Sequence, residues 1–356
     1  MISQRYRSRW LGGGMRANGN RAVRFKHALN GRDGEVTYEL ICRATGFVCR
    51  RITSLRGGGQ VSLTLPVDTL GTLRLLLDAD DEASAHRHAL REMLLQAAFA
   101  GIPEDDRARN ESARPTADSA RGASDPALDD ELGVHAYLKA LAASIGMDGY
   151  IAFAGDLAHR LGPYLHLLVG CTPGWVPRYL QQRWYMNDPL LKQSVDSGRP
   201  IMGSEIERHD DIARGIAKNS ARHAIFAAAC FPSAVNAPGI HARFGCVVLV
   251  SSLNAARVEP LIKDRSVFAR GAVSTAVDAW VDALKRDAVY GARLSARELA
   301  VLTQWREGDT AVQSALALGV AESGVNYHRR SIKMKLGAAN LRDAYAIAAD
   351  LGLLRS

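Results

Sequence analysis

The chain has no long hydrophobic run. Its 356 residues contain no uninterrupted apolar stretch of about 18 residues, the length that a membrane-crossing helix needs. The positively charged start, MISQRYRSRW, is not followed by the continuous apolar segment of a secretory signal peptide. Both absences argue against a membrane-spanning or exported protein and predict a cytoplasmic one.

Cysteine is scarce and shows no pairing in the sequence. The five cysteines form no C-x-x-C pair, and neither they nor the ten histidines have the spacing of a zinc site. His86 and His88 stand two residues apart on one predicted helix, which points them to different faces. We therefore expect buried thiols, no metal and no cofactor. A thiol hydrolase that uses Cys171 or Cys230 finds no histidine at a supporting spacing, so we expect no enzyme.

The positive charge of the chain favours polyanionic partners only weakly. The net charge is +8, but residues 1–34 alone carry eight Lys or Arg against one Asp. We expect residues 1–20 to be a flexible basic arm, or to precede a true start at Met15. The hydrophobic content of 47% excludes wholesale disorder and supplies the cores of two or three domains.

Residues 104–130 divide the chain. The segment EDDRARNESARPTADSARGASDPALDD has no hydrophobic periodicity, which indicates a linker. Residues 21–103 ahead of it are predicted to form a small α+β domain with a helix over 82–100. Gly57–Gly59 indicates a hairpin turn, because a strand follows it and not the helix that a phosphate-binding loop needs. The predicted strands of this domain are 36–42, 47–53, 61–67 and 70–77.

The central segment, 131–286, carries a candidate ligand site. Trp175 and Tyr179 stand at i and i+4 on one predicted helix, and Asp188 follows nine residues after the tyrosine. Two aromatic rings with polar tips and one carboxylate suit an amphiphilic small molecule, because the rings bury its carbon skeleton and the polar groups bind its head. The alternative is that the rings only fill the core, and spacing alone favours that alternative.

The last segment, 294–356, predicts four short helices with a tight turn at Leu318–Gly319. The helix after this turn places Val325, Ile332 and neighbours in a core stripe and basic and polar side chains on the other side, with no acidic residue between 323 and 336. Such a face can enter the major groove of DNA, although a solvated basic face is the commoner explanation of charge alone. The candidate DNA-contacting residues are Ser323, Asn326, Tyr327, Arg329, Arg330, Lys333 and Lys335.

The helices around this one have recognisable ends. Ser295 and Glu298 fit an S-x-x-E capping box, which gives the buried carboxylate a structural role. Thr310 is a plausible cap for the second helix. The fourth helix, 340–350, has a recurring apolar stripe that would suit a dimer if it stayed exposed. The stripe consists of Leu341, Ala344, Tyr345, Ala348 and Leu351.

The last segment resembles the LuxR-type DNA-binding domain. Ala321 and Gly324 replace the usual Ser and Thr, which removes hydroxyl groups that cap the recognition helix or contact phosphate, and the glycine weakens the helix by up to about 1 kcal/mol. We therefore expect weak or partner-dependent DNA affinity. The matching positions are Leu294, Arg297, Glu298, Val301, Leu302, Trp305, Gly308, Thr310, Ala315, Leu318, Gly319, Val320, Glu322, Val325, His328, Ile332, Lys335, Leu336, Asn340, Ala344, Ala348 and Leu351–Leu353.

The central pattern P-x-W-x3-Y-x8-D-P is similar to the autoinducer-binding domain of LuxR-type quorum-sensing receptors. The resemblance implies that Tyr179 and Asp188 bind an acyl-homoserine lactone, the aspartate taking its amide N–H, and that Trp175 lines the pocket. The strand over 246–251 would supply the opposite wall. Tyr150 and Ser251 are the further lining candidates.

One departure affects the ligand. The family has a second tryptophan fifteen residues after the aspartate, which donates to the lactone carbonyl, and this chain has Gly203 there. The loss of this tryptophan removes a hydrogen bond worth about 0.5–1.5 kcal/mol and enlarges the cavity. The ligand is therefore either an acyl-homoserine lactone or a related amphiphile, and the sequence does not choose between them. Residues 63–78 are similar to the closing hairpin of GAF-type sensor domains, which assigns the first domain no role.

We therefore expect an α+β protein: an α/β/α sandwich sensor domain over 131–286, then an all-α four-helix helix-turn-helix domain over 290–356, with the small N-terminal α+β domain ahead of both. The predicted function is a homodimeric transcription regulator that binds double-stranded promoter DNA at a two-fold operator under the control of a small-molecule signal. The alternative is an interaction protein of the same fold that sequesters a regulator or ligand without reading DNA.

Overall fold

The computed structural model describes residues 23–30, 33–43, 46–80, 128–207, 209–292, 294–306 and 308–354. The helix predicted over 82–100, the arm over 1–20 and nearly all of the linker lie outside these ranges. Within them, no helix is long and apolar enough to cross a membrane.

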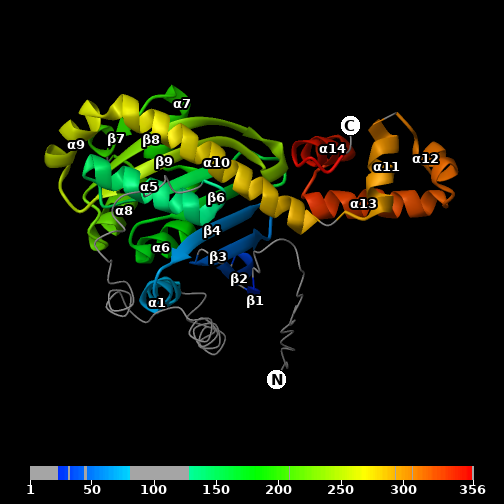
Figure 1. The fold of residues 1–356 in the computed structure, drawn as a ribbon, viewed down its shortest axis with the longest axis horizontal. Helices are drawn as coiled ribbons and strands as arrows, with labels where there is room; N and C mark the ends of the chain where they lie inside the picture. The colour runs from blue at the N-terminus through cyan, green and yellow to red at the C-terminus, as the bar shows by residue number, and fades with distance from the viewer. Residues whose placement is uncertain are drawn as a thin grey trace, which may run out of the picture.

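One nine-stranded sheet runs through the larger part of the molecule, in the order β1-β2-β3-β4-β6-β5-β9-β8-β7 (Figure 1). Neighbouring strands are antiparallel except β4 and β6, which are parallel. The strands are β1 Val23–Asn30, β2 Gly34–Arg43, β3 Gly46–Leu55, β4 Gln60–Val67, β5 Gly149–Asp156, β6 Tyr164–Val169, β7 Ile201–Met202, β8 Ala227–Ala237 and β9 Ala242–Ser251.

The N-terminal strands continue the sheet of the sensor domain. The α+β content predicted for residues 21–103 is present in the described part, but its strands do not form a separate sheet, because β4 pairs with β6 from Gln60↔Tyr164 to Thr64↔Leu168. Every residue of β4 after Gln60 is buried, as expected for a strand covered on both faces and paired on both sides. The alternation of residues identifies such a strand but not its partner.

Residues 70–77 were expected as a strand and instead form most of helix α1, Leu70–Ala79. Thr69 caps this helix by accepting a hydrogen bond from the Thr72 N–H. The leucines at 70, 73, 76 and 77 are buried, which is the i, i+3, i+4 spacing of a helix face. The turn at Gly57–Gly59 between β3 and β4 is confirmed, with Gly58 and Gly59 at φ +94° and +86°.

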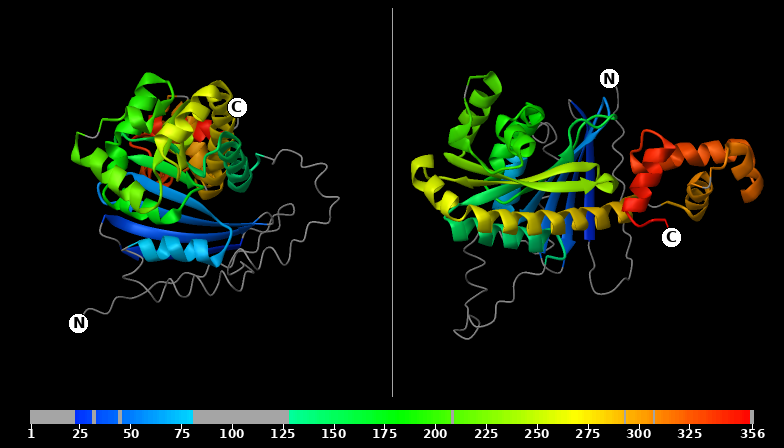
Figure 2. Two further views of the ribbon diagram at one scale, coloured as in Figure 1. Left: turned by 90° about the vertical axis from the view of Figure 1, so that its left-hand side faces the viewer. Right: turned by 90° about the horizontal axis from the view of Figure 1, so that it is seen from above.

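Helices cover both faces of the sheet and make an α/β/α sandwich (Figure 2). The first face packs against α1 and a group of short helices that contains Trp175 and Tyr179 and has Asp188 at the N-cap of one member. These are η1 Pro173–Trp175, α6 Val176–Gln181, η2 Trp184–Met186, α7 Pro189–Ser197 and α8 Asp211–Arg222. The second face packs against α5 Glu131–Ile145, α9 Ala255–Asp264 and α10 Ser266–Ala292.

A buried ion cluster joins the N-terminal strands to the second layer of helices. Arg50 of β3 donates to Glu131 Oε1 at the start of α5 (2.7 Å) and to Asp287 Oδ2 near the end of α10 (2.6 Å). Arg50 and Glu131 are 8% and 1% exposed, so solvent screens these charges little. The strand is thereby tied to the long helix that leads to the C-terminal domain.

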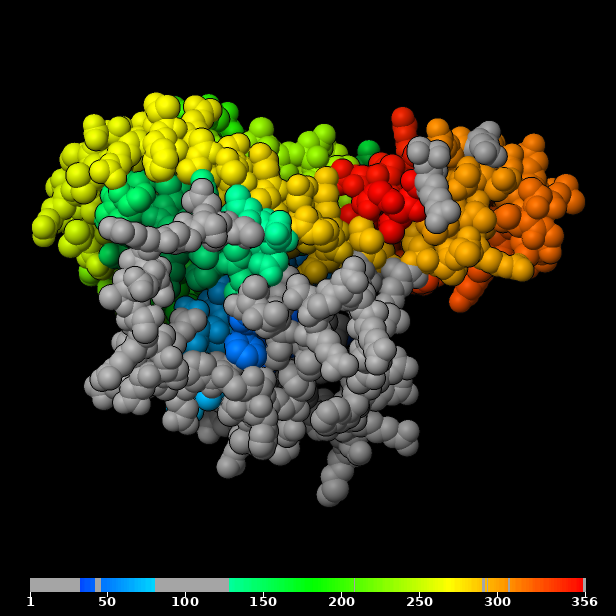
Figure 3. Space-filling view, viewed as in Figure 1, coloured from blue at the N-terminus to red at the C-terminus, as the bar shows by residue number. Residues whose placement is uncertain are grey.

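The C-terminal domain packs four helices around its own core and stands at one end of the sandwich (Figure 3). They are α11 Ala296–Arg306, α12 Ala311–Leu318, α13 Glu322–Leu336 and α14 Leu341–Asp350. The apolar stripe of the fourth helix, which would suit a dimer if it stayed exposed, is turned into this core: Ala344, Ala348 and Leu351 are buried, and Leu341 and Tyr345 pack against them. It is therefore a packing surface of the domain itself.

The C-terminal domain also contacts the sandwich directly. Asp350 accepts a hydrogen bond from the Gly239 N–H of η4, Pro238–Ile240, and pairs with Lys285 Nζ of α10, both at 2.9 Å. His241 Nε2 lies 3.2 Å from the Leu336 carbonyl at the end of α13. The two domains thus meet at the carboxyl ends of α13 and α14.

Candidate DNA-reading helix and ligand site

Helix α13 is formed as the turn predicts. Gly319 ends α12 in the left-handed region (φ +63°), and Ala321 occupies the N-cap of α13 without a side-chain hydrogen bond. The missing cap agrees with the expected effect of replacing Ser by Ala. Helix α12 has the predicted cap, because Thr310 and Gln313 form a reciprocal capping box.

The outer face of α13 is open. Val325, Ile332 and Leu336 are buried in the domain core and His328 is half-buried, which confirms the predicted stripe. Of the candidate DNA-contacting residues, Ser323, Asn326, Tyr327 and Arg330 are exposed and Lys333 is half-buried. Four of these five project away from the core on one side of the helix, and Lys333 flanks them.

Met334 was missed by the sequence analysis. It is 72% exposed, and helical spacing places it on the stripe of Tyr327 and Arg330, at i+7 and i+4. The sequence does contain a signal for this residue, because Met334 is an apolar side chain on the side of the helix opposite the core stripe. An apolar side chain on a groove-facing surface can contact the methyl group of thymine.

Two of the candidate residues have structural partners. Arg329 Nη2 donates to the Asp309 carbonyl in the loop between α11 and α12 (3.2 Å), and Arg329 is half-buried. Lys335 Nζ pairs with Glu298 Oε2 of α11 (2.7 Å). This ion pair places Lys335 on the side of α13 that packs against α11. Helical geometry agrees, because Lys335 is rotated by about 100° from its neighbour Met334 on the outer face.

Glu298 organises the contact between α11 and α13. The predicted capping box with Ser295 is present, and Ser331 Oγ donates to Glu298 Oε1 (2.7 Å). Burial raises the pKa of this carboxyl, but the hydrogen bonds from Lys335, Ser295 and Ser331 outweigh it and lower the pKa to about 2. The carboxylate stays charged and holds α13 against α11.

Trp175, Tyr179 and Asp188 lie together on the first face of the sheet. The Trp175 and Tyr179 rings stack at 4.5 Å between centroids, although Trp175 belongs to η1 and only Tyr179 to α6. The Tyr179 hydroxyl donates to Asp188 Oδ2 at 2.8 Å. Asp188 also caps α7 by accepting hydrogen bonds from the N–H groups of Leu190 and Leu191. The pattern therefore assembles one contact group.

Burial controls the charges of this group. It raises the pKa of the Asp188 carboxyl, whereas the hydrogen bonds from Tyr179 and from the two N–H groups oppose the rise. Burial and the adjacent Asp188 raise the pKa of the Tyr179 hydroxyl well above its ordinary value. The hydroxyl therefore stays protonated and donates to the carboxyl oxygen.

Helix α8 supplies partners that the sequence did not indicate. Trp175 Nε1 donates to Ser220 Oγ (3.0 Å), and Asn219 Nδ2 donates to the Trp175 carbonyl (3.0 Å). Asn219 is 2% exposed. No spacing links α8 to the tryptophan, because the contact joins residues more than forty positions apart.

Tyr150 and Ser251 lie on the other face of the sheet. Tyr150 alternates along β5 with Ile151 and Phe153, which belong to the first core, and its hydroxyl bonds His135 Nδ1 of α5 (2.8 Å). Ser251 donates to Asp148 Oδ2 (3.2 Å). Because strand residues alternate between the two faces of the sheet, the prediction that Tyr150 and Ser251 line the site of Tyr179 is wrong. Phe153 and, from β9, Cys246, Val248 and Val250 face the site instead.

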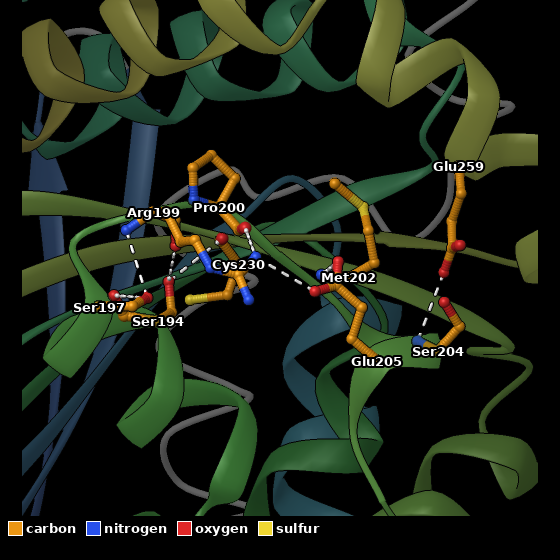
Figure 4. A network of polar contacts seen from close by, with 9 residues as sticks. All are labelled: Ser194, Ser197, Arg199, Pro200, Met202, Ser204, Glu205, Cys230 and Glu259. Atoms are coloured by element: carbon orange, nitrogen blue, oxygen red, sulfur yellow. Dashed lines mark hydrogen bonds and ion pairs between the residues drawn. The ribbon is translucent and has the colours of Figure 1, made fainter.

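Gly203 lies close to β8. An added Cβ would stand 3.1 Å from the Ala228 carbonyl oxygen, so a side chain at position 203 would require β8 to move by a few tenths of an ångström. Hydrogen bonds hold this segment in place (Figure 4): the Met202 N–H donates to Glu205 Oε1, and the Ser204 N–H donates to Glu259 Oε1. The enlargement of the cavity by the loss of the tryptophan stays a prediction.

Comparison with known families assigns both domains. Residues 292–348 match the model of bacterial regulatory proteins of the luxR family, and residues 130–283 match the autoinducer binding domain. Together these matches cover more than half of the chain, and both are domains of transcription regulators.

The chain is similar to one known regulator in sequence and to two solved structures in fold. The transcriptional activator protein PhzR of Pseudomonas fluorescens is 29% identical over 186 residues, which are 51% of this chain and 72% of that protein. The crystal structure of Escherichia coli SdiA is 20% identical, with a TM-score of 0.45, and the match covers 64% of this chain and 92% of SdiA. A second SdiA structure, in complex with octanoyl-rac-glycerol, has a TM-score of 0.44 at 20% identity, over 64% of this chain and 90% of that one.

Three observations lead to one conclusion. The two matched domains follow each other in this order, the first contains the buried group of Trp175, Tyr179 and Asp188, and the second has an open basic face on α13. The chain belongs to the LuxR-type quorum-sensing regulators and is a ligand-controlled transcription regulator.

Proposed function

We propose that the protein acts in the cytoplasm as a homodimer whose sensor domain binds an amphiphilic small molecule at Trp175, Tyr179 and Asp188. The observation that carries this proposal is the buried hydrogen bond between Tyr179 and Asp188 beneath the stacked indole. A carboxylate that is 7% exposed, among aromatic rings, is an orienting group for a donor on an otherwise apolar molecule.

The chemistry of the site defines the ligand class. Asp188 is an acceptor, so the ligand offers it an amide N–H or a hydroxyl, and the rings of Trp175 and Tyr179 bury an acyl chain. Position 203 carries no side-chain donor, so no side chain there selects a lactone carbonyl. Acyl-homoserine lactones and other acylated molecules with one polar donor both fit this description.

The DNA contacts divide into reading and positioning. Ser323, Asn326 and Arg330 face outward near the start and middle of α13, where side chains reach base edges, and Lys333 neutralises phosphate. Arg329 and Lys335 hold α13 against the rest of its domain. In this scheme a variant of Arg330 loses contacts to DNA, whereas a variant of Lys335 loses stability of the domain.

Ligand and DNA are linked through the dimer. A ligand that binds the folded sensor better than it binds other states shifts the population toward the folded sensor. Helix α10 connects the sensor to the reader, so the orientation of α10 sets the position of the reader. Two readers at a set spacing then fit a two-fold operator. The alternative, a sequestering protein that does not read DNA, is not favoured, because both regulator domains are matched and the outer face of α13 is open.

The test of the ligand site is thermal unfolding of the full chain with N-octanoyl-homoserine lactone and 1-octanoylglycerol as probes. At least one probe should raise the melting temperature, and Asp188→Asn should abolish the rise, since the amide disturbs the acceptor pattern. Asp196→Asn, an exposed residue on the same helix α7, is the matched control and should keep it. Full protection of the Asp188 variant would discard this carboxylate as the ligand anchor.

A further inference from the structure

A small hollow lies inside the DNA-reading domain, between α11, the turn before α13 and α13 itself. Its volume is about 110 Å³, which approaches the roughly 150 Å³ of an apolar protein cavity that binds benzene. All of its lining belongs to the reader, so it is separate from the site proposed in the sensor. The lining residues are Arg297 and Val301 of α11, Leu318 at the end of α12, Val320 in the turn and His328 of α13.

The floor of the hollow is aliphatic. Val301 is fully buried, and Leu318 and Val320 are half-buried against the core of the domain. These side chains offer no polar atom to a ligand, so the group that packs against them must be apolar. The floor therefore favours one compact hydrocarbon body.

The rim of the hollow is polar and open to a ligand. Arg297 is exposed and His328 is half-buried. In the part of the chain that the structure describes, neither the Arg297 guanidinium nor the His328 ring has an ion pair or a hydrogen bond, whereas Arg329 and Lys335 of the same domain are both bonded. A guanidinium binds a carboxylate through two parallel N–H donors, and an imidazole N–H can add a third. The rim therefore favours a carboxylate.

The hollow adjoins the weakest part of the reading helix. Ala321 occupies the N-cap of α13 without a side-chain hydrogen bond, and Gly324 in the first turn lowers the helix propensity. Val320 precedes this stretch and His328 follows it, and both line the hollow. A ligand that contacts these two residues and α11 at once would span the weak stretch and hold it against α11.

We propose that this hollow is an effector site for a small monocarboxylate whose apolar body is about the size of one benzene ring. The carboxylate binds Arg297 and a ring N–H of His328, and the apolar body lies against Val301, Leu318 and Val320. A neutral ligand leaves the guanidinium without a counter-charge, and a cationic one meets a like charge.

Occupation of the hollow strengthens DNA binding. A ligand that binds only when α13 is formed and packed on α11 stabilises that form, which is the form that presents Asn326 and Arg330 to DNA. The reader thus responds to a second signal at a site of its own, distinct from the amphiphile proposed for the sensor.

Amide NMR titration of the full chain tests the ligand class. The probes are benzoate, benzamide, which has the same shape without the charge, and acetate, which has the charge without the ring. Benzoate should bind saturably, at least tenfold more tightly than either other probe, and should shift the amide signals of the five lining residues. No saturable shift with benzoate, or equal binding of benzoate and benzamide, overturns the proposal.

Two variants locate the site. Arg297→Gln should weaken benzoate binding at least fivefold, and Val320→Phe should abolish it by filling the hollow. The controls are Arg306→Gln, an exposed arginine at the end of α11, and Val312→Phe, an exposed valine of α12, and both should bind benzoate as the wild type does. Equal affinities in the Arg297 and Arg306 variants would place the binding elsewhere and refute the assignment. Asp188→Asn should not alter benzoate binding, which separates this result from the outcome at the sensor site.

Promoter binding tests the effect on the reader. Saturating benzoate should tighten promoter binding of the wild type at least fivefold in fluorescence anisotropy and slow hydrogen exchange in the first turn of α13. The promoter affinity of Arg297→Gln should stay the same with and without benzoate. Benzoate that binds the wild type without changing its promoter affinity would refute the effector role.

Discussion

The DNA-reading domain and the N-terminal strands differ in the range of the contacts that stabilise them. Within the reader, the polar contacts between α13 and the rest of its own domain span shorter distances along the chain, such as 37 positions for Lys335 and Glu298. The N-terminal strands depend on partners much farther along: Arg50 reaches Glu131 over 81 positions and Asp287 over 237. The reader is thus a local unit, whereas the strands become part of a domain only when the sensor folds beside them.

The largest test of this difference is Arg50→Ala. It leaves Glu131 and Asp287 without their shared cation, and removing one partner of a buried ion pair costs about 3–5 kcal/mol. Because the cluster joins the strands to the sensor, both should lose stability together, measured by urea unfolding. The triple variant Arg50→Met, Glu131→Gln, Asp287→Asn removes all three charges of the cluster and should recover part of the lost free energy of unfolding. An unfolding midpoint like that of Arg74→Ala, an exposed arginine of α1, would show that the strands are independent of the sensor.

The reader should respond separately at its surface. Arg330→Ala is expected to weaken promoter binding by about 1–3 kcal/mol, or roughly 5- to 150-fold, without changing the stability of either domain. Lys333→Ala should weaken binding to all sequences alike and reduce the salt dependence. Fluorescence anisotropy at several salt concentrations measures both. Arg257→Ala, an exposed arginine on α9 of the sensor, is the control. Affinities equal to that of the control in both variants would disprove the assignment of the outer face.

Within the reader, Glu298→Gln removes a local contact and should affect this domain alone. The loss of hydrogen bonds to a charged group is expected to cost about 1–3 kcal/mol. Since the folded pKa of about 2 lies below the ordinary 4.5, the contribution is present above pH 4.5 and is lost as the pH falls toward 2. Hydrogen exchange in α11 and α13 should speed up in the variant at pH 6 and differ less from wild type near pH 3. Equal exchange in the variant and in Glu207→Gln, an exposed carboxylate, would contradict this role.

The smallest effect is expected where the two regions meet. Asp350→Asn removes the charge that pairs with Lys285 but keeps an acceptor for Gly239, so the change should be about 0.5–1 kcal/mol. The Gly239 N–H should then exchange a few times faster. Asp282→Asn, exposed on α10, serves as control. Unchanged exchange at Gly239 would mean that the carboxylate does not hold the reader on the sandwich.

The accuracy of sequence analysis followed the same division. Helix ends in the reader were predictable from Ser295, Thr310 and Gly319, because caps and left-handed residues act within a few positions. The site pattern of Trp175, Tyr179 and Asp188 spans fourteen positions and is assembled as expected. Tyr150 and Ser251 were misplaced, because the face of a strand residue depends on which face is covered by which helices.

The differences in the N-terminal segment have two physical origins. Residues 70–77 satisfy both a strand pattern and a helix pattern, since leucine fits both, and Thr69 with the packing of the leucines decided for the helix. The parallel pairing of β4 with β6 has no sequence signature, since hydrogen bonds between backbones do not depend on side-chain identity.

The sequence by itself determined the helices of the reader, the polarity of α13, the Tyr179–Asp188 spacing and the family. Each of these depends on residues close together, where propensity, capping and periodicity act. Only the tertiary structure decided that the N-terminal strands extend the sensor sheet, that Arg50 and Arg51 face opposite layers and that α14 packs inward. These outcomes depend on burial against distant partners, and that free energy exists only once the chain has brought them together.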